Sequence, residues 1–110
     1  MTFNELEEKV LQWAMDRKII PNSNPTAQLM KTMSELGELA DATLKDDDDG
    51  IIDGIGDVLV TLIIYCELYG TDLTDCLANA YDTIKDRKGT LTAEGIFVKE
   101  TGSGDERLNG

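Results

Sequence analysis

The stretch IIDGIGDVLVTLIIYCELY, residues 51–69, constrains the fold more than any other part of the sequence. An acidic run precedes it and Gly70 follows it, so its length and boundaries predict a helix rather than a strand. When it is wound as a helix, its apolar side chains point in nearly every direction, a pattern typical of a helix that is buried on all sides. A chain of 110 residues offers little material for such burial. We therefore expect a second copy of the chain to cover part of this helix.

Capping residues and breaks predict the other helices. Asn24 followed by Pro25 is typical of a helix start, and the run DDDDG at 46–50 ends one helix and caps the next near Asp49. Gly70 ends that helix, and Thr71 or Asp72 caps another. The segment TLTAEGIFVKE has weak strand character around a turn at Gly95. The predicted fold is an all-α, four-helix bundle with helices at about 4–18, 25–45, 50–69 and 72–87, a short C-terminal arm, a single domain over 1–98 and a flexible tail over 99–110.

Charge and composition exclude several classes of function. The formal net charge of −12 argues against binding to a nucleic acid polymer or to an anionic membrane surface, because both need clustered Lys and Arg. The chain has no histidine, which excludes Ser–His triads and nearly all zinc sites. Cys66 and Cys76 do not form a disulfide framework and fit a reducing cytoplasm. The N-terminal residues lack the pattern of a signal peptide, and no apolar run is long enough to span a bilayer.

Two polar stripes are predicted to face each other. Asp53, Asp57 and Thr61 recur at i, i+4 and i+8 on the apolar helix. In an antiparallel hairpin, Glu38 lies roughly 9 Å before one helix ends and Asp57 roughly 10 Å after the next begins, so the two carboxylates meet at the same height. The stripe on the preceding helix consists of Lys31, Glu35, Glu38 and Lys45.

Four carboxylates in one pocket repel one another unless some bind protons or a divalent cation neutralises them. Oxygen ligands without nitrogen or sulfur favour Mg²⁺ or Mn²⁺, with Ca²⁺ as a further option. The simpler interpretations are a solvated face for Glu35 and Glu38, and a helix cap for the DDDD run. The position of Asp57 is not explained by the helix dipole, because the dipole acts mainly within the first turn and Asp57 lies beyond it. Trp13 is interpreted as a core residue or as a stacking surface for a base.

The motifs SELGELADA and DGIGDVLVTL, followed by LANAYDTIKDRKG, resemble the MazG-like nucleoside triphosphate pyrophosphohydrolases of the all-α NTP pyrophosphatase superfamily, in particular short phage-encoded members. Glu35 and Glu38 match the family's ExxE, and Asp57 matches the final acid of its ExxD. The resemblance covers about residues 28–89. The first acid of ExxD falls on Gly54, and Asp53 is the candidate substitute because it shares a face with Asp57.

The resemblance implies hydrolysis of a nucleoside triphosphate to a monophosphate and pyrophosphate. Glu35, Glu38 and Asp57 would then act as catalytic residues and hold Mg²⁺, or Mn²⁺ in its place, with help from Asp53. It also implies a homodimer or a dimer of dimers, and the host cytoplasm as location for a phage protein. The predicted substrate-binding residues are Lys31, Asn79, Lys85, Arg87 and Trp13. The alternative, favoured by Gly54, is a catalytically inactive helical dimer that acts as a nucleotide-binding or adaptor protein.

Overall fold

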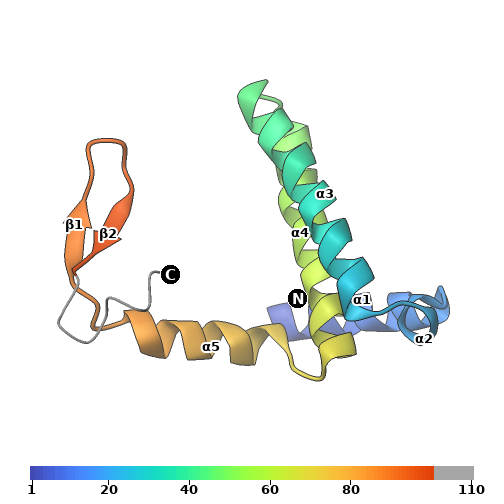
Figure 1. The fold of residues 1–110 in the computed structure, drawn as a ribbon. Helices are drawn as coiled ribbons and strands as arrows, with labels where there is room; N and C mark the ends of the chain where they lie inside the picture. The colour runs from blue at the N-terminus through green and yellow to red at the C-terminus, as the bar shows by residue number, and fades with distance from the viewer. Residues whose placement is uncertain (101–110) are drawn as a thin grey trace. The chain divides into compact units, whose positions relative to one another are not determined.

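The computed structural model describes residues 1–100 and contains five helices and one β-hairpin in this part of the chain (Figure 1). The chain divides into two compact units, residues 1–76 and residues 77–110. The first unit holds α1 to α4 and the start of α5, and the second holds the rest of α5 and the hairpin. The all-α class predicted from the sequence is confirmed, with one short helix more than the predicted four.

The first two helices are joined by a residue whose backbone has the left-handed helical conformation. Helix α1, Phe3–Asp16, begins with a capping box between Thr2 and Glu5, which lowers the pKa of Glu5 through hydrogen bonds from Thr2. Lys18 has φ of 65° and redirects the chain into the single turn α2, Ile19–Asn22. The sequence analysis predicted no helix over these residues, which include Pro21. A proline is nevertheless tolerated in the first turn of a helix, where its missing N–H has no intrahelical partner.

The long helices α3, Pro25–Leu44, and α4, Asp48–Tyr69, form an antiparallel pair that makes the most extensive contact in the described chain (Figure 1). Asn24 caps α3 by accepting a hydrogen bond from the backbone N–H of Ala27 at 2.8 Å. Asp47, two residues before the predicted cap, accepts from the N–H of Gly50 at 3.0 Å. Gly70 ends α4 at φ of 101°, a conformation that glycine adopts at little cost. The antiparallel helical hairpin predicted from the sequence is thus formed by α3 and α4.

Small residues let α3 and α4 approach closely. A Cβ atom on Gly54 would lie 3.1 Å from the Cβ of Leu39 and 3.2 Å from its Cα. Further along the pair, the buried Thr32 and Thr61 hydroxyls are 2.8 Å apart and hydrogen-bonded. Thr61, the last member of the predicted polar stripe of α4, therefore faces α3, and its hydroxyl is satisfied by a partner on that helix rather than by solvent.

The buried apolar core of the described residues is small. It consists of Ala14, Ala42, Ile63, Ile64 and Cys66. Several large apolar side chains of α4 remain accessible in the single chain, with Ile52 69% and Ile55 49% exposed. Burial of α4 on all sides is therefore not achieved within one chain. No described helix is both long enough and apolar enough to cross a bilayer.

The remaining elements are short. Helix α5, Leu73–Ile84, begins where Asp72 accepts a hydrogen bond from the N–H of Asp75 at 2.8 Å, and it ends three residues before the predicted boundary. Strands β1, Gly89–Leu91, and β2, Phe97–Lys99, pair antiparallel with Thr90 opposite Val98. The weak strand signal around Gly95 is thus a β-hairpin. The single domain over 1–98 stays a prediction, and residues 101–110 of the predicted tail lie outside the described residues.

Candidate functional site

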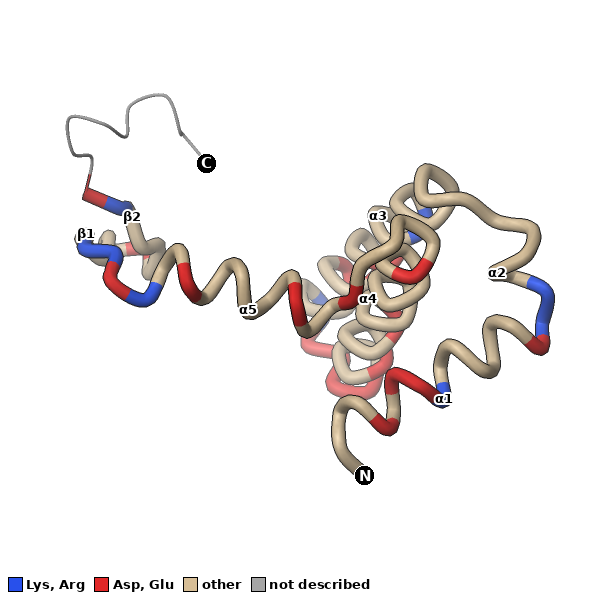
Figure 2. The backbone as a smooth tube through the Cα atoms, turned by 90° about the horizontal axis from the view of Figure 1, so that it is seen from below, with Lys and Arg blue, Asp and Glu red and all other residues tan. Residues whose placement is uncertain are grey.

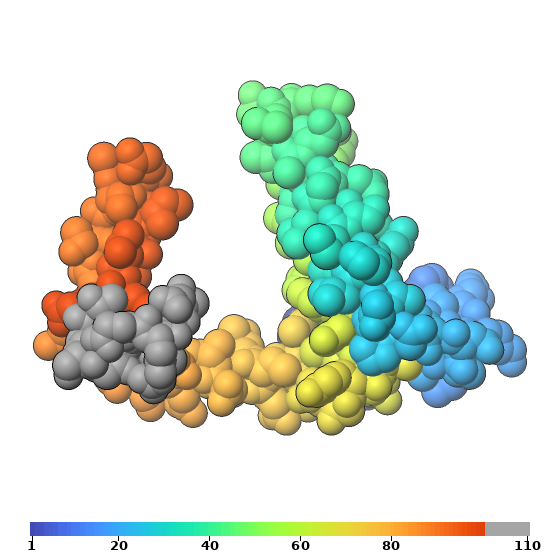
Figure 3. Space-filling view, in the orientation of Figure 1, coloured from blue at the N-terminus to red at the C-terminus, as the bar shows by residue number. Residues whose placement is uncertain are grey.

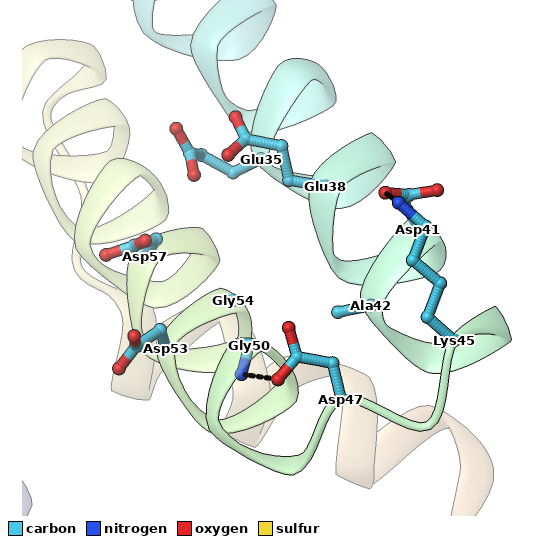
Figure 4. Close-up of a pocket in the computed structure, with 10 residues that line it drawn as sticks. All are labelled: Glu35, Glu38, Asp41, Ala42, Lys45, Asp47, Gly50, Asp53, Gly54 and Asp57. Atoms are coloured by element: carbon cyan, nitrogen blue, oxygen red, sulfur yellow. Dashed lines mark hydrogen bonds and ion pairs between the residues drawn. The ribbon is translucent and has the colours of Figure 1, made fainter.

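A pocket of about 370 Å³ lies along the groove between α3 and α4, within the first unit (Figure 4). Figure 4 shows Glu35 and Glu38 side by side on α3, with Asp57 and Asp53 on successive turns of α4. The structure thus brings together the four acids that the sequence analysis placed on facing stripes. The pocket is lined by Glu35, Glu38, Asp41, Ala42, Lys45, Asp47, Gly50, Asp53, Gly54 and Asp57.

The four acids differ in their surroundings. Glu35 is buried, with only 10% of its side chain exposed, and its Oε2 lies 3.2 Å from the ammonium of Lys31. Glu38, Asp53 and Asp57 are exposed. Figure 2 shows acidic residues, in red, recurring along the α3–α4 pair with few basic residues beside them. The pocket therefore concentrates negative charge around one carboxylate that is already shielded from water.

Three charged residues of the lining were not proposed as site residues from the sequence. Asp41 continues the i, i+3 series of Glu35 and Glu38 along α3, and this spacing was a signal that could have identified it. Lys45 Nζ lies 2.9 Å from Asp41 Oδ2. The hydrogen bond to Asp41 and the negative charge of Asp41, with a further contribution from the charge of Asp47, raise the pKa of Lys45. Asp47 caps α4, which agrees with the interpretation of the DDDD run as a cap.

Gly54 belongs to the lining but contributes no ligand. Its close approach to Leu39 leaves little space for a side chain. The acid missing from the ExxD pattern is therefore replaced by helix–helix packing at that position. Asp53, on the neighbouring position of the same helix, does line the pocket.

The other predicted site residues lie elsewhere. Lys31 is not among the lining residues and pairs with Glu35. Trp13 lines an adjacent pocket, of which Asp57 is also part. Asn79, Lys85 and Arg87 belong to the second unit. There Lys85 lies 3.3 Å from Asp82.

The pocket offers oxygen donors of the kind that bind hard divalent cations. Its lining contains six carboxylates and one ammonium group, with no histidine or thiol, and such a donor set suits Mg²⁺ or Mn²⁺. Within residues 1–100, no three of these side chains lie close enough together to ligate one ion in the present rotamers. The exposed acids Glu38, Asp53 and Asp57 would have to turn inward on binding.

The antiparallel pair of α3 and α4, with its acid-lined groove, defines an all-α protein that carries carboxylates on two neighbouring helices. The model of the MazG nucleotide pyrophosphohydrolase domain matches residues 23–92. The chain belongs to this family, as the two acidic motifs indicate.

Relatives from phages share parts of the sequence and the fold. Over 60 residues, the chain is 40% identical to an uncharacterised 18.2 kDa protein encoded between rep and hol in Haemophilus phage HP1, covering 54% of this chain and 37% of that protein. A cyanophage S-2L MazG-like pyrophosphohydrolase, solved with dGDP and three catalytic Mn²⁺ ions per active site, superimposes with a TM-score of 0.71 at 22% identity. That match covers 94% of this chain and 97% of the cyanophage chain and shows the shared fold.

Proposed function

We propose that this protein is a Mg²⁺-dependent pyrophosphohydrolase that converts a nucleoside triphosphate and water into a nucleoside monophosphate and pyrophosphate. One observation carries the proposal: in a chain of the MazG family, four carboxylates from two facing helices line one pocket. The cyanophage protein with the same fold binds dGDP and Mn²⁺, which supports a nucleotide and a divalent cation at such a site.

The acids have distinct roles in this proposal. Glu35, Glu38 and Asp57 hold the cation, and Asp53 takes the part of the acid missing at Gly54. When bound, a divalent cation neutralises phosphate charge and lowers the pKa of water. In this proposal Glu38 or Glu35 orients the attacking water and accepts its proton, and Glu38 is the more exposed of the two.

The ion pair between the exposed Lys31 and the buried Glu35 positions the least accessible of the proposed ligands. Lys31 Nζ lies 3.2 Å from Glu35 Oε2 and favours one orientation of that carboxylate. Lys31 also stays a proposed substrate-binding residue. Lys85 and Arg87 remain proposed contacts of the pyrophosphate, and Asn79 a proposed contact of the sugar or base. Trp13 lines the apolar pocket beside Asp57 and is the proposed stacking surface for the base.

The proposed assembly is a homodimer or a dimer of dimers, which would cover the exposed apolar side chains of α3 and α4. Its relatives in phages support the host cytoplasm as the proposed location. The competing proposal is an inactive nucleotide-binding or adaptor protein, which the lost acid at Gly54 favours.

Pyrophosphate release from a panel of dNTPs, measured with Mg²⁺, with Mn²⁺ and with EDTA, separates these proposals. We expect release that requires the metal and falls at least about a hundredfold in Asp57→Asn, since a metal ligand is lost. Glu67→Gln is the matched control, because Glu67 is an exposed acid of the same helix that does not line the pocket.

Equal release from the Asp57→Asn variant would mean that the activity is a contaminant. Nucleotide binding without release, in a folded wild-type protein, would establish the adaptor instead.

A further inference from the structure

A second, apolar pocket adjoins the acidic one. It has a volume of about 340 Å³ and lies between α1 and α4 in the first unit. Asp57 borders both pockets, so a molecule whose phosphates lie at the acidic pocket can extend its other end into the apolar one. The apolar pocket is lined by Leu6, Lys9, Val10, Trp13, Asp57 and Val60.

The shape and chemistry of this pocket suit a flat aromatic ring. Trp13 is 45% exposed, which leaves much of its indole open to a ligand. Leu6, Val10 and Val60 supply apolar walls. A base can stack on an indole whatever its identity, because every base has a π-face. Stacking alone therefore gives affinity without choosing between bases.

Lys9 is the residue of this pocket that can discriminate between bases through hydrogen bonds. Asp57 is committed to the cation in the proposed function, which leaves Lys9 as the remaining charged side chain of the lining. Lys9 takes part in none of the ion pairs between residues 1–100, although it also borders a polar cleft formed by Glu5, Glu8 and Gln12. Its ammonium group is therefore available to a ligand.

An ammonium group donates hydrogen bonds and accepts none. On the edge that carries the 6-substituent of purines and the 4-substituent of pyrimidines, guanine, thymine and uracil present a carbonyl oxygen. Adenine and cytosine present an amino donor at the same place. A lysine at this edge pairs with the carbonyl and meets a second donor in the amino bases.

We infer that Lys9 is a specificity-determining residue that makes the site prefer nucleotides of guanine, thymine or uracil over those of adenine or cytosine. This inference rests on the proposed function for the nucleotide and adds the class of base. A matched lysine–carbonyl contact corresponds to a preference of about tenfold in affinity.

The chain has one tryptophan, so its fluorescence reports on this pocket directly. The experiment titrates the full-length protein, with Mg²⁺, against the α,β-methylene analogues of dGTP, dTTP, dATP and dCTP, and records quenching of Trp13. We expect dGTP and dTTP analogues to bind about tenfold more tightly than the other two. Lys9→Met should abolish this ratio, Lys9→Arg should retain it because arginine is also a pure donor, and Lys18→Met, a change at an exposed lysine outside the pocket, should leave it unchanged.

Each result decides the inference. The inference is overturned if the ratio of the affinities for the dGTP and dTTP analogues to those for the dATP and dCTP analogues is the same in wild type and Lys9→Met. This holds also where Lys9→Met lowers the affinity for all four analogues by the same factor. Hydrolysis of dNTPs without any quenching of Trp13 overturns the inference and leaves the proposed function standing. Selective quenching that depends on Lys9, in a protein that releases no pyrophosphate, supports the inference and overturns the proposed hydrolysis.

Discussion

Gly54 occupies the position of an acid in the family's ExxD pattern, and a Cβ atom at this position would meet Leu39 on the neighbouring helix. A Cβ atom there would lie 3.2 Å from the Cα of Leu39, which can move only with its helix. Gly56, two residues later on the same helix, has no atom within 4 Å of the equivalent position. The two glycines therefore provide a matched pair in which only the local packing differs.

Alanine should have opposite effects at these two positions. We expect Gly56→Ala to raise the free energy of unfolding by about 0.5–1 kcal/mol, because alanine is the better helix former. Gly54→Ala should lower it by about 1 kcal/mol, since overpacking against Leu39 outweighs that gain. Thermal unfolding at one protein concentration measures both. A Gly54→Ala variant as stable as Gly56→Ala would show that the helices can separate freely.

The two thiols should differ in reactivity with pH. Burial, and then the charge and hydrogen bond of Cys76, raise the pKa of Cys66 from 9.0 to about 11. At pH 8 we expect a disulfide reagent such as DTNB to titrate the exposed Cys76 rapidly and Cys66 only after unfolding, because the thiolate is the nucleophile. Rapid reaction of both thiols in the folded protein would contradict this assignment.

The same shift sets the direction of a stability change at high pH. Above pH 9 the Cys66 thiol ionises in the unfolded chain but stays neutral in the folded one. Its contribution to stability is therefore full below pH 9 and is lost between pH 9 and 11. The Cys66→Ser variant should show a smaller loss over this interval in denaturant unfolding.

At the scale of the elements, a buried hydroxyl pair connects the two long helices. Thr32 donates to Thr61 Oγ1 at 2.8 Å or to the carbonyl of Gln28 at 2.9 Å, and Thr61 donates to the carbonyl of Val58. Both side chains are buried. The pair fixes which turn of α3 lies against which turn of α4, and so helps to set the height at which the acids meet.

Removing one hydroxyl should cost more here than at a solvated threonine. We expect Thr32→Val to lower the free energy of unfolding by about 1–2 kcal/mol, because Thr61 loses a buried partner. Thr43→Val is the control, since Thr43 makes a similar bond to the carbonyl of Leu39 but is exposed. A double-mutant cycle with Thr61→Val should give a coupling of roughly 0.5–1 kcal/mol. A coupling near zero would show that the two hydroxyls act independently.

The helical elements and their order could be predicted from the sequence because capping residues such as Asn24 and Gly70 act locally. The facing of the acidic stripes followed from the short connection between α3 and α4 alone. The turn α2 was missed because the tolerance for Pro21 depends on its place within a helix that only the left-handed Lys18 starts. The pairing of Lys31 with Glu35 was also missed, since sequence spacing allows this contact but does not show that the carboxylate is buried.

At the scale of the whole molecule, one chain leaves a large apolar surface open on α3 and α4. In Figure 3 the side chains of α3 lie in front of α4 and face the viewer without cover from other parts of the first unit. Such an exposed apolar surface is unusual for a monomer. The exposed apolar residues of the two helices are Leu29, Met30, Met33, Leu36, Leu44, Ile52, Ile55, Leu59 and Tyr69.

We expect light scattering to give at least a dimer at micromolar concentration, because apolar area of this kind drives association. Met33→Glu and Ile55→Glu, which place charges on this surface, should shift the protein toward the monomer. Leu91→Glu is the control, as Leu91 is an exposed apolar residue of the hairpin. A wild-type protein that stays monomeric at 100 µM, or a dimer unaffected by both changes, would contradict this location of the interface.

All ten residues that line the acidic pocket fall between Glu35 and Asp57, on two helices and the three-residue turn that joins them. The pocket is therefore specified by one uninterrupted portion of the gene rather than assembled from distant ones. A single recombination event that spans this portion would transfer all six acids of the pocket at once and leave the flanking segments unchanged.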